Sequence, residues 1–290
     1  MALSFLAQEA ADTVSIADRL HTALTTLEPA RPIGNLHASA LTRGAFCPRE
    51  VALCKKLART PYPQKIEAPM QITFQEGRDK QARFNNDWLR KDMVGDWRCD
   101  HCGVVTRWAR NALTCSACQS KSLTYQEVVF YHPSGARGSL DAIVYVDRPL
   151  LRLVEFKIMG MKEWELLKMP LAEHRIRSQL YLELIKASSH PHRAQIDTTR
   201  MHVVYCLRGY GKKDAVKERI SPFKEFIVKA SPEAVEPYFK MAWAVTASRE
   251  SEWAEVPEGV CTTLFDQRCH SCCVAKDCFS GLYPATVKWK

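Results

Sequence analysis

The chain has 290 residues, of which 46% are hydrophobic and 25% charged, and its formal net charge is +9. These values lie near the averages of globular proteins, so we expect one large domain or two modest ones and exclude a largely disordered chain. No apolar run approaches the ~20 residues of a membrane helix, and the N-terminus lacks the features of a secretory signal. We therefore expect a cytosolic protein without a membrane partner, and the positive charge favours a polyanionic partner.

The expected elements alternate between helices and strands. We predict helix within residues 1–30, a helical stretch from 36 to about 57 and a helix from about 71 to 92. Two strands follow at 138–146 and 150–158, then a helix at 171–187, an interior strand at 201–207, a helix at 232–247 and an irregular tail from 256. This order is typical of an α/β or α+β fold.

The sequence carries twelve cysteines, and without a secretory signal metal binding is a better expectation for them than disulfides. One group of four is spaced as two C-x2-C knuckles separated by twelve residues, which is typical of structural zinc: Cys99, Cys102, Cys115 and Cys118. We predict that this segment is a zinc ribbon inserted into the host domain. Between its knuckles, Arg107, Trp108 and Arg110 form a basic and aromatic patch that either contacts DNA or faces solvent.

A second group of cysteines lies near the C-terminus. Cys269, Cys272 and Cys278 follow a C-x2-C-x5-C spacing, which supplies three thiolates and leaves a fourth position open. Thiolates suit an iron–sulfur cluster or zinc, and buried free thiols are the alternative. Cys273 is a spare, and Cys54, Cys206 and Cys261 are interpreted as ordinary cysteines.

The two predicted strands bring carboxylates together. In a hairpin centred on Arg148, Asp141 and Glu155 lie directly opposite each other, with Cβ atoms about 5 Å apart. Lys157 shares the face of Glu155 because side chains alternate along a strand. Such a pair suits Mg²⁺, which polarises a scissile phosphate, and Lys157 would orient water or neutralise developing charge. The alternative is a surface hairpin whose charges face solvent.

These residues resemble the signature of the PD-(D/E)XK nucleases. Asp141 is followed fourteen positions later by Glu155-Phe156-Lys157, and Gly138 precedes it as in the G-x-x-D form of RecB-like members. Gln179 resembles the glutamine of their Q-x-x-x-Y motif, which positions the site. The chain departs from that motif, because Glu183 stands at the tyrosine position and the tyrosine is Tyr181. It also has Gln81 where many members have a metal-binding histidine.

The resemblance extends to both ends of the chain. Cys47 lies in a segment, Ser39-x-Leu…Cys47-Pro-Arg, that resembles the N-terminal element of RecB-like nucleases with an iron–sulfur staple, including AddB-type enzymes and the exonucleases of CRISPR adaptation. This likeness implies a [4Fe–4S] cluster held by Cys47, Cys269, Cys272 and Cys278.

Together these features predict a metal-dependent DNA nuclease. The expected fold is an α/β PD-(D/E)XK, restriction-endonuclease-like core with helical wrapping. Its parts are an N-terminal helical region (1–95), the ribbon (96–122), the nuclease core (123–255) and the iron–sulfur segment (256–290). It would hydrolyse DNA, single-stranded or at duplex ends, as an exonuclease in a prokaryotic or virus-infected cell, with Mg²⁺ or Mn²⁺ and with a protein partner in a DNA-processing complex. A catalytically silent DNA-binding or partner-binding protein and an electron-transfer protein are the alternatives.

Overall fold

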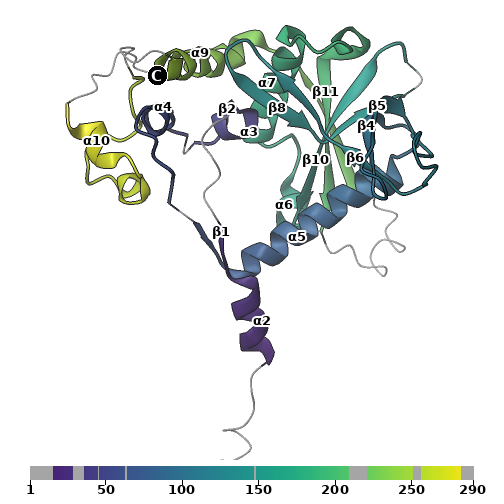
Figure 1. The fold of residues 1–290 in the computed structure, drawn as a ribbon, viewed down its shortest axis with the longest axis horizontal. Coiled ribbons are helices and arrows are strands. Elements are labelled where there is room, and N and C mark those ends of the chain that lie inside the picture. The colour runs from purple at the N-terminus through teal and green to yellow at the C-terminus, as the bar shows by residue number, and fades with distance from the viewer. Residues whose placement is uncertain are drawn as a thin grey trace, which may run out of the picture.

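The computed structural model describes residues 16–28, 36–44, 46–62, 64–146, 148–208, 221–250 and 256–281, and it has a mixed α/β fold (Figure 1). The part of the predicted N-terminal helix that precedes residue 16 lies outside the described residues. Within the described ranges, no helix is long and apolar enough to cross a bilayer.

The central sheet has four strands in the order β12-β11-β10-β9. They are β9 (Ala142–Val144), β10 (Leu151–Met159), β11 (Ile196–Leu207) and β12 (Phe223–Lys229). β10 and β11 are parallel and the other two pairs are antiparallel. β11 is interior, as its continuous apolar run predicts, and it begins five residues before the predicted start at 201.

A second sheet has the order β2-β8-β7, with β2 (Leu36–His37), β7 (Val128–Tyr131) and β8 (Ala136–Leu140). β8 and β9 are consecutive, and Asp141 is the single residue between them. The predicted strand 138–146 is therefore divided at Asp141, where the chain leaves one sheet and enters the other. This division places Asp141 at the junction of the two sheets.

Helix α7 (Ala172–Ala187) connects β10 to β11 and covers both sheets, as a parallel strand pair requires. It matches the helix predicted at 171–187. Its apolar residues, among them Leu180, Leu184 and Ile185, are buried in the main core. The short helices α6 (Met161–Leu166) and η2 (Arg193–Gln195) flank it. Helix α9 (Pro232–Glu250) packs on α7 and α4 (Pro48–Lys56), and it confirms the helix predicted from 232.

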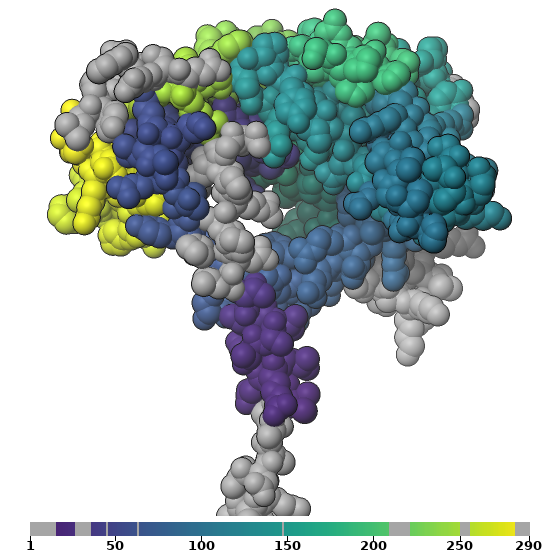
Figure 2. All heavy atoms as spheres, viewed as in Figure 1, coloured from purple at the N-terminus to yellow at the C-terminus, as the bar shows by residue number. Residues whose placement is uncertain are grey.

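Helix α5 (Ala68–Arg83) continues into the π-helical turn η1 (Phe84–Trp88) below the central sheet in Figure 1. The helix predicted from 71 begins three residues earlier, with Pro69 in its first turn, where proline is favoured. Phe84 stacks on Phe156 with ring centroids 4.1 Å apart, which fixes α5 against the sheet face opposite α7. Helix α2 (Ile16–Leu24) projects from the body, as Figure 2 shows, and has no buried residue.

Two N-terminal predictions are wrong in detail. Residues Thr26–Glu28, expected to be helical, form β1, which pairs with β3 (Gln64–Ile66). The single helix predicted from 36 to 57 is divided into β2, α3 (Ala38–Leu41) and α4. Pro48 explains this division, since proline disfavours a helical conformation in the residue before it and fits the first turn of a new helix.

The ribbon forms its own three-stranded sheet, β5-β4-β6, from β4 (Val94–Cys99), β5 (Val105–Arg110) and β6 (Leu123–Gln126). At the other end of the molecule, the C-terminal segment contains η3 (Gln267–Ser271) and α10 (Ala275–Phe279). Helix α10 lies beside α4 (Figure 1), so the C-terminal segment packs on a helix from the N-terminal region.

Candidate active site and cysteine centres

Strands β9 and β10 pair in the predicted register. Val144 faces Arg152, and Ala142 faces Val154. One further step along this ladder places Asp141 opposite Glu155. The alternation of side chains across the strands then puts both carboxylates on the face covered by α7.

Glu155 is buried, Asp141 is partly buried, and the two acids share one lysine. Glu155 is 2% exposed, so the solvent-facing hairpin is excluded. The Nζ atom of Lys157 lies 2.5 Å from Glu155 Oε1 and 3.5 Å from Asp141 Oδ2. Asp141 Oδ2 also accepts a hydrogen bond of 2.7 Å from the backbone N–H of Phe156. From α7, Arg177 Nη1 lies 3.7 Å from Glu155 Oε1.

The electrostatics of this group result from its burial. Burial and the neighbouring Glu155 raise the pKa of Asp141 to about 6. Burial alone would lower the pKa of Lys157, but the charges of Asp141 and Glu155 outweigh it and raise that pKa above its ordinary value. Lys157 is therefore a permanent cation between the carboxylates. In the described part of the chain, Glu155 Oε2 is buried without a hydrogen-bond partner, which is unusual for a carboxylate oxygen.

Helix α7 brings Tyr181 rather than Gln179 to this site. A Cβ atom at Gly138 would lie 2.4 Å from Tyr181 Cε1, so the tyrosine ring packs directly on the glycine. Burial, Glu155 and Asp141 all raise the pKa of Tyr181. Gln179 Nε2 donates instead to the carbonyl of Lys229, 3.3 Å away. Residues two apart on a helix face different directions, so the two side chains diverge.

Gln81, which stands where many RecB-like members have a metal-binding histidine, contacts a neighbour one helical turn away. Its Nε2 lies 3.4 Å from Asn85 Oδ1. Two residues that were not predicted do reach the site from α7: Arg177, which contacts Glu155, and His174, one turn earlier. Arg177 follows His174 by three residues and precedes Tyr181 by four, and residues so spaced share one face of a helix. This spacing is the one signal in the sequence that would have grouped them.

A cleft of about 390 Å³ opens beside Lys157. Tyr205 Oη accepts a hydrogen bond from the N–H of Leu171 and also lies 2.8 Å from His174 Nδ1, within hydrogen-bond distance. Burial, Lys157 and Arg177 lower the pKa of His174 to about 4, so its ring is neutral. The lining residues are Lys157, Ile158, Met159, Gly160, Glu163, Leu171, His174, Tyr205 and Arg208.

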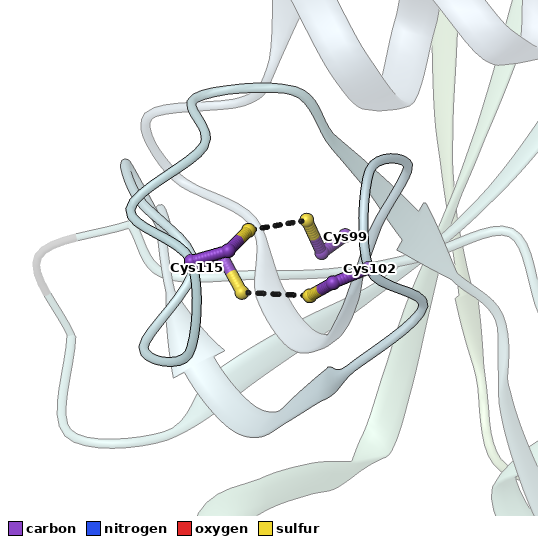
Figure 3. A group of neighbouring side chains, drawn as sticks. Cys99, Cys102 and Cys115 are labelled. Carbon is purple, nitrogen blue, oxygen red and sulfur yellow. Dashed lines mark hydrogen bonds between the residues drawn. The ribbon is translucent and has the colours of Figure 1, made fainter.

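The four ribbon cysteines converge as their spacing predicts. Figure 3 shows the sulfurs of Cys99, Cys102 and Cys115 pointing toward one another, and the fourth ligand atom belongs to Cys118. The Sγ atoms lie 3.6 Å apart in the pair Cys99–Cys118 and 3.5 Å apart in the pair Cys102–Cys115. Four thiolates about 2.3 Å from a tetrahedral zinc are about 3.8 Å from one another. The group therefore has the dimensions of a four-coordinate metal site.

The backbone of the first knuckle favours thiolate. The N–H groups of Cys102 and His101 lower the pKa of Cys99 to about 6. Gly103, with φ of 75°, allows the tight turn that directs these groups at the sulfur.

The other predicted cysteines also come together. Cys47, Cys269, Cys272 and Cys278 line one small cavity between α4 and the C-terminal segment. Cys261, expected to be an ordinary cysteine, lines the same cavity. Cys273 is directed elsewhere, because its Sγ atom lies 3.3 Å from that of Cys54.

Arg49, next to this cavity, ties the two ends together. Its side chain is 5% exposed, and it donates from Nε to Cys278 Sγ and from Nη2 to the carbonyl of Cys278, both at 3.0 Å. A second link joins Arg268 and Glu50 at 3.0 Å. The cysteines are therefore held beside one another by contacts that need no metal.

The basic and aromatic patch of the ribbon is engaged within the molecule. Trp108 stacks on His192 with ring centroids 4.5 Å apart and donates to Gln195. Arg107 pairs with Asp96 at 2.5 Å, and Arg110 lies 3.9 Å over the ring of Tyr145. Arg107 and Arg110 remain exposed, whereas Trp108 is partly buried by its contacts, and DNA binding by the three residues stays a prediction.

Comparison with known proteins gives distant structural likenesses alone. No family model matches the chain, and no curated protein matches it. An alkaline exonuclease from Laribacter hongkongensis is 15% identical over 81% of this chain and 93% of its own, with a TM-score of 0.42. The structure of that enzyme in complex with dAMP is 14% identical over 76% of this chain and 90% of its own, with a TM-score of 0.43. Likenesses at this level of identity and TM-score carry no argument about the function of this chain.

Proposed function

We propose that the chain is a metal-dependent DNA nuclease of the PD-(D/E)XK, RecB-like type, acting as an exonuclease. The observation that carries this proposal is the pair of the partly buried Asp141 and the buried Glu155, held opposite each other with Lys157 between them. Placing two carboxylates side by side away from water costs free energy, and a bound cation would offset that cost. The net charge of +9 favours DNA as the substrate.

The residues fit a divalent cation. Glu155 offers a buried carboxylate oxygen, Oε2, that has no partner in the described structure, and Asp141 supplies a second acid. Oxygen ligands of this kind are those that Mg²⁺ and Mn²⁺ prefer. When bound, such a cation supplies Lewis-acid polarisation of the scissile phosphate.

The protein's own groups prepare the rest of the reaction. Lys157 presents a fixed positive charge to the phosphate and stabilises the charge that develops on it. Arg177 restrains Glu155, and Tyr181 packs on Gly138 to hold the strand that ends at Asp141. The neutral ring of His174 lines the cleft beside Lys157 and offers a hydrogen-bonding group to the bound nucleotide. Gln179 is proposed only as a distant positioning residue.

The two cysteine centres are proposed to be structural. The ribbon group has the sulfur separations of zinc. For the small cavity lined by Cys47, Cys269, Cys272 and Cys278 we propose a [4Fe–4S] cluster, because the four cysteines have the spacing of the iron–sulfur staple and meet at one place in the fold. A protein partner in a DNA-processing complex and an intracellular prokaryotic setting are proposed with the nuclease.

The test is cleavage of end-labelled single-stranded and duplex DNA with Mn²⁺. Glu155→Gln and Lys157→Ala should each abolish cleavage, while DNA binding persists because phosphate contacts are spread over many basic residues. Glu225→Gln, which removes an acid from β12 of the same sheet, is the matched control and should cleave as wild type does. A Glu155→Gln protein that cleaves at the wild-type rate would refute the assignment. An inactive wild-type protein that binds DNA would favour the silent alternative.

A further inference from the structure

A third acid stands in line with the proposed catalytic pair. Strands β7 and β8 pair with Val128 opposite Leu140 and Val129 opposite Ser139. One further step of this register places Glu127 opposite Asp141. Asp141 thus has Glu155 across from it on one side and Glu127 on the other. The three carboxylates form a row across three neighbouring strands, with Cβ atoms about 5 Å apart at each step.

This row leads from solvent into the core. Glu127 is exposed, the side chain of Asp141 is 18% exposed and that of Glu155 is 3% exposed. Lys157 and Arg177 neutralise the buried end. In the described ranges, no lysine or arginine forms an ion pair with Glu127, which hydrogen-bonds the Ser139 side chain. Partial burial of its carboxyl group and the charge of Asp141 outweigh the more distant Lys157 and raise the pKa of Glu127. The two acids at the outer end of the row therefore repel each other, and like charges directly opposite each other destabilise a sheet.

The oxygens of the row are also available to a ligand. The hydrogen bond from Phe156 and the contact with Lys157 both use Oδ2 of Asp141, which leaves Oδ1. At the inner end, Glu155 Oε2 is buried and has no partner among the described residues. A hydrogen bond to Ser139 alone does not explain why Glu127 lies opposite Asp141. It also does not explain why Glu155 Oε2, one strand further on, has no partner among the described residues.

We infer that Glu127 is a further cation ligand, which with Asp141 holds a divalent cation at the solvent side of the site. This inference rests on the proposed nuclease function and adds a residue outside its signature motif. Mg²⁺ is usually held by one or two carboxylates together with water and substrate phosphate, which is what the pair Glu127 and Asp141 offers. An ion there lies on the side from which DNA reaches Asp141, while the position beside Glu155 lies deeper.

Cation binding tests this without relying on activity. The free Mn²⁺ remaining in solution is measured by electron paramagnetic resonance as the DNA-free, full-length protein is titrated. Glu127→Gln should raise the Mn²⁺ concentration for half-saturation of the outer position by about tenfold or more, as loss of a ligand contact does. Glu127→Asp should retain much of the binding, and Glu225→Gln should bind as wild type does. Equal binding by Glu127→Gln and wild type would overturn the inference.

Cleavage then separates this inference from the proposed function. Glu127→Gln should require about tenfold more Mn²⁺ for half-maximal cleavage, whereas Glu155→Gln should be inactive at every concentration. If Glu127→Gln has the wild-type Mn²⁺ dependence while Glu155→Gln is inactive, Glu127 is not a ligand and the nuclease proposal stands. If Glu155→Gln is active, the nuclease site itself is misplaced. Because Glu127 is exposed, its substitution should leave the melting temperature unchanged, which verifies that the variant is folded.

Discussion

At the residue scale, Gly138 shows how the site depends on the close approach of two elements. Tyr181 from α7 occupies the space in which a Cβ atom at position 138 would lie, and Asp141 lies three residues further along the chain. The contact therefore sets the distance between α7, which carries Arg177, and the strand that leads to Asp141. A glycine is required at this position by packing, not by an unusual backbone angle.

Gly138→Ala should lower the free energy of unfolding by about 1–3 kcal/mol, because the added methyl group overlaps the buried ring of Tyr181. Urea unfolding measures this loss. Gly77→Ala is the matched control, since a Cβ atom there meets nothing within 4 Å and alanine favours the helix, so stability should rise by about 0.5–1 kcal/mol. Equal effects at the two positions would contradict the packing argument.

His174 should make the folded state sensitive to mild acid. Burial, Lys157 and Arg177 hold its pKa at about 4, below the ordinary 6.5. As pH falls below 6.5, the unfolded chain gains a proton at this residue that the folded chain excludes until about pH 4. The free energy of unfolding should therefore decrease as pH falls through this window, by on the order of 1 kcal/mol between about pH 7.5 and about pH 5.

The variant His174→Asn isolates this contribution. Its stability should fall less than that of wild type over the same pH range in urea unfolding, while His101→Asn on the exposed ribbon turn should behave as wild type does. Identical pH dependence of wild type and His174→Asn would show that the ring is not held neutral.

Part of the site is predictable from sequence at this scale, and part is not. The pairing of Asp141 with Glu155 results from the alternation of side chains and the position of the turn, so local rules suffice. Glu127 and Arg177 join the site through the pairing of β7 with β8 and the packing of α7. The sequence prediction does not include β7, and the packing of α7 on the sheets depends on the assembled fold, so neither residue is predicted. Gln179, chosen by resemblance, bonds to the backbone of β12 instead.

At the element scale, the sequence predicts elements whose pattern is continuous and misses those interrupted by proline or completed by distant partners. α7 and α9 carry long helical patterns, and both are observed where predicted. β1 and β3 are three residues each and exist because they pair with each other across the chain. Their own sequences, Thr26–Glu28 and Gln64–Ile66, have too little length to indicate a strand.

The ribbon strands share a hydrophobic core with the host domain. Trp97 and Tyr125 are buried in the same cluster as Phe84 and Phe156, and Trp108 stacks on His192 outside that cluster. The polar segment between the knuckles has little apolar surface, as its sequence indicates, and the flanking strands supply the rest. Its metal site should therefore stabilise the knuckles, while the host supports β4 and β6.

Cys99→Ser should remove one zinc per chain and loosen residues near the knuckles without unfolding the host. Hydrogen exchange should show faster exchange in residues 99–122 and unchanged protection in α7, and elemental analysis should show the loss of zinc. Cys206→Ser, a buried cysteine of β11 outside both groups, is the control and should keep its zinc. Loss of protection in α7 on Cys99→Ser would show that the ribbon is not a separate unit of stability.

At the scale of the whole molecule, the cysteine cavity closes the described chain on itself. Cys47 and Cys278 are 231 positions apart (278 − 47), and Arg49, Glu50 and Arg268 bridge the same two segments. The C-terminal segment contains only short helices and contributes few large apolar side chains to the core. It depends on this junction to stay in place, so the cluster proposed there should affect the stability of the entire fold.

Cys47→Ser should therefore destabilise the whole protein, unlike Cys99→Ser. A covalent link across ~100 residues contributes about 4–5 kcal/mol in the loop model, against a total stability of about 5–15 kcal/mol for typical domains. The variant should be colourless and poorly soluble, whereas Cys206→Ser should keep the brown colour of an iron–sulfur protein. Wild type purified without oxygen should contain about four irons and one zinc per chain. Two zincs and no iron would refute the cluster, and a Cys47→Ser protein as stable as wild type would refute the role of this junction.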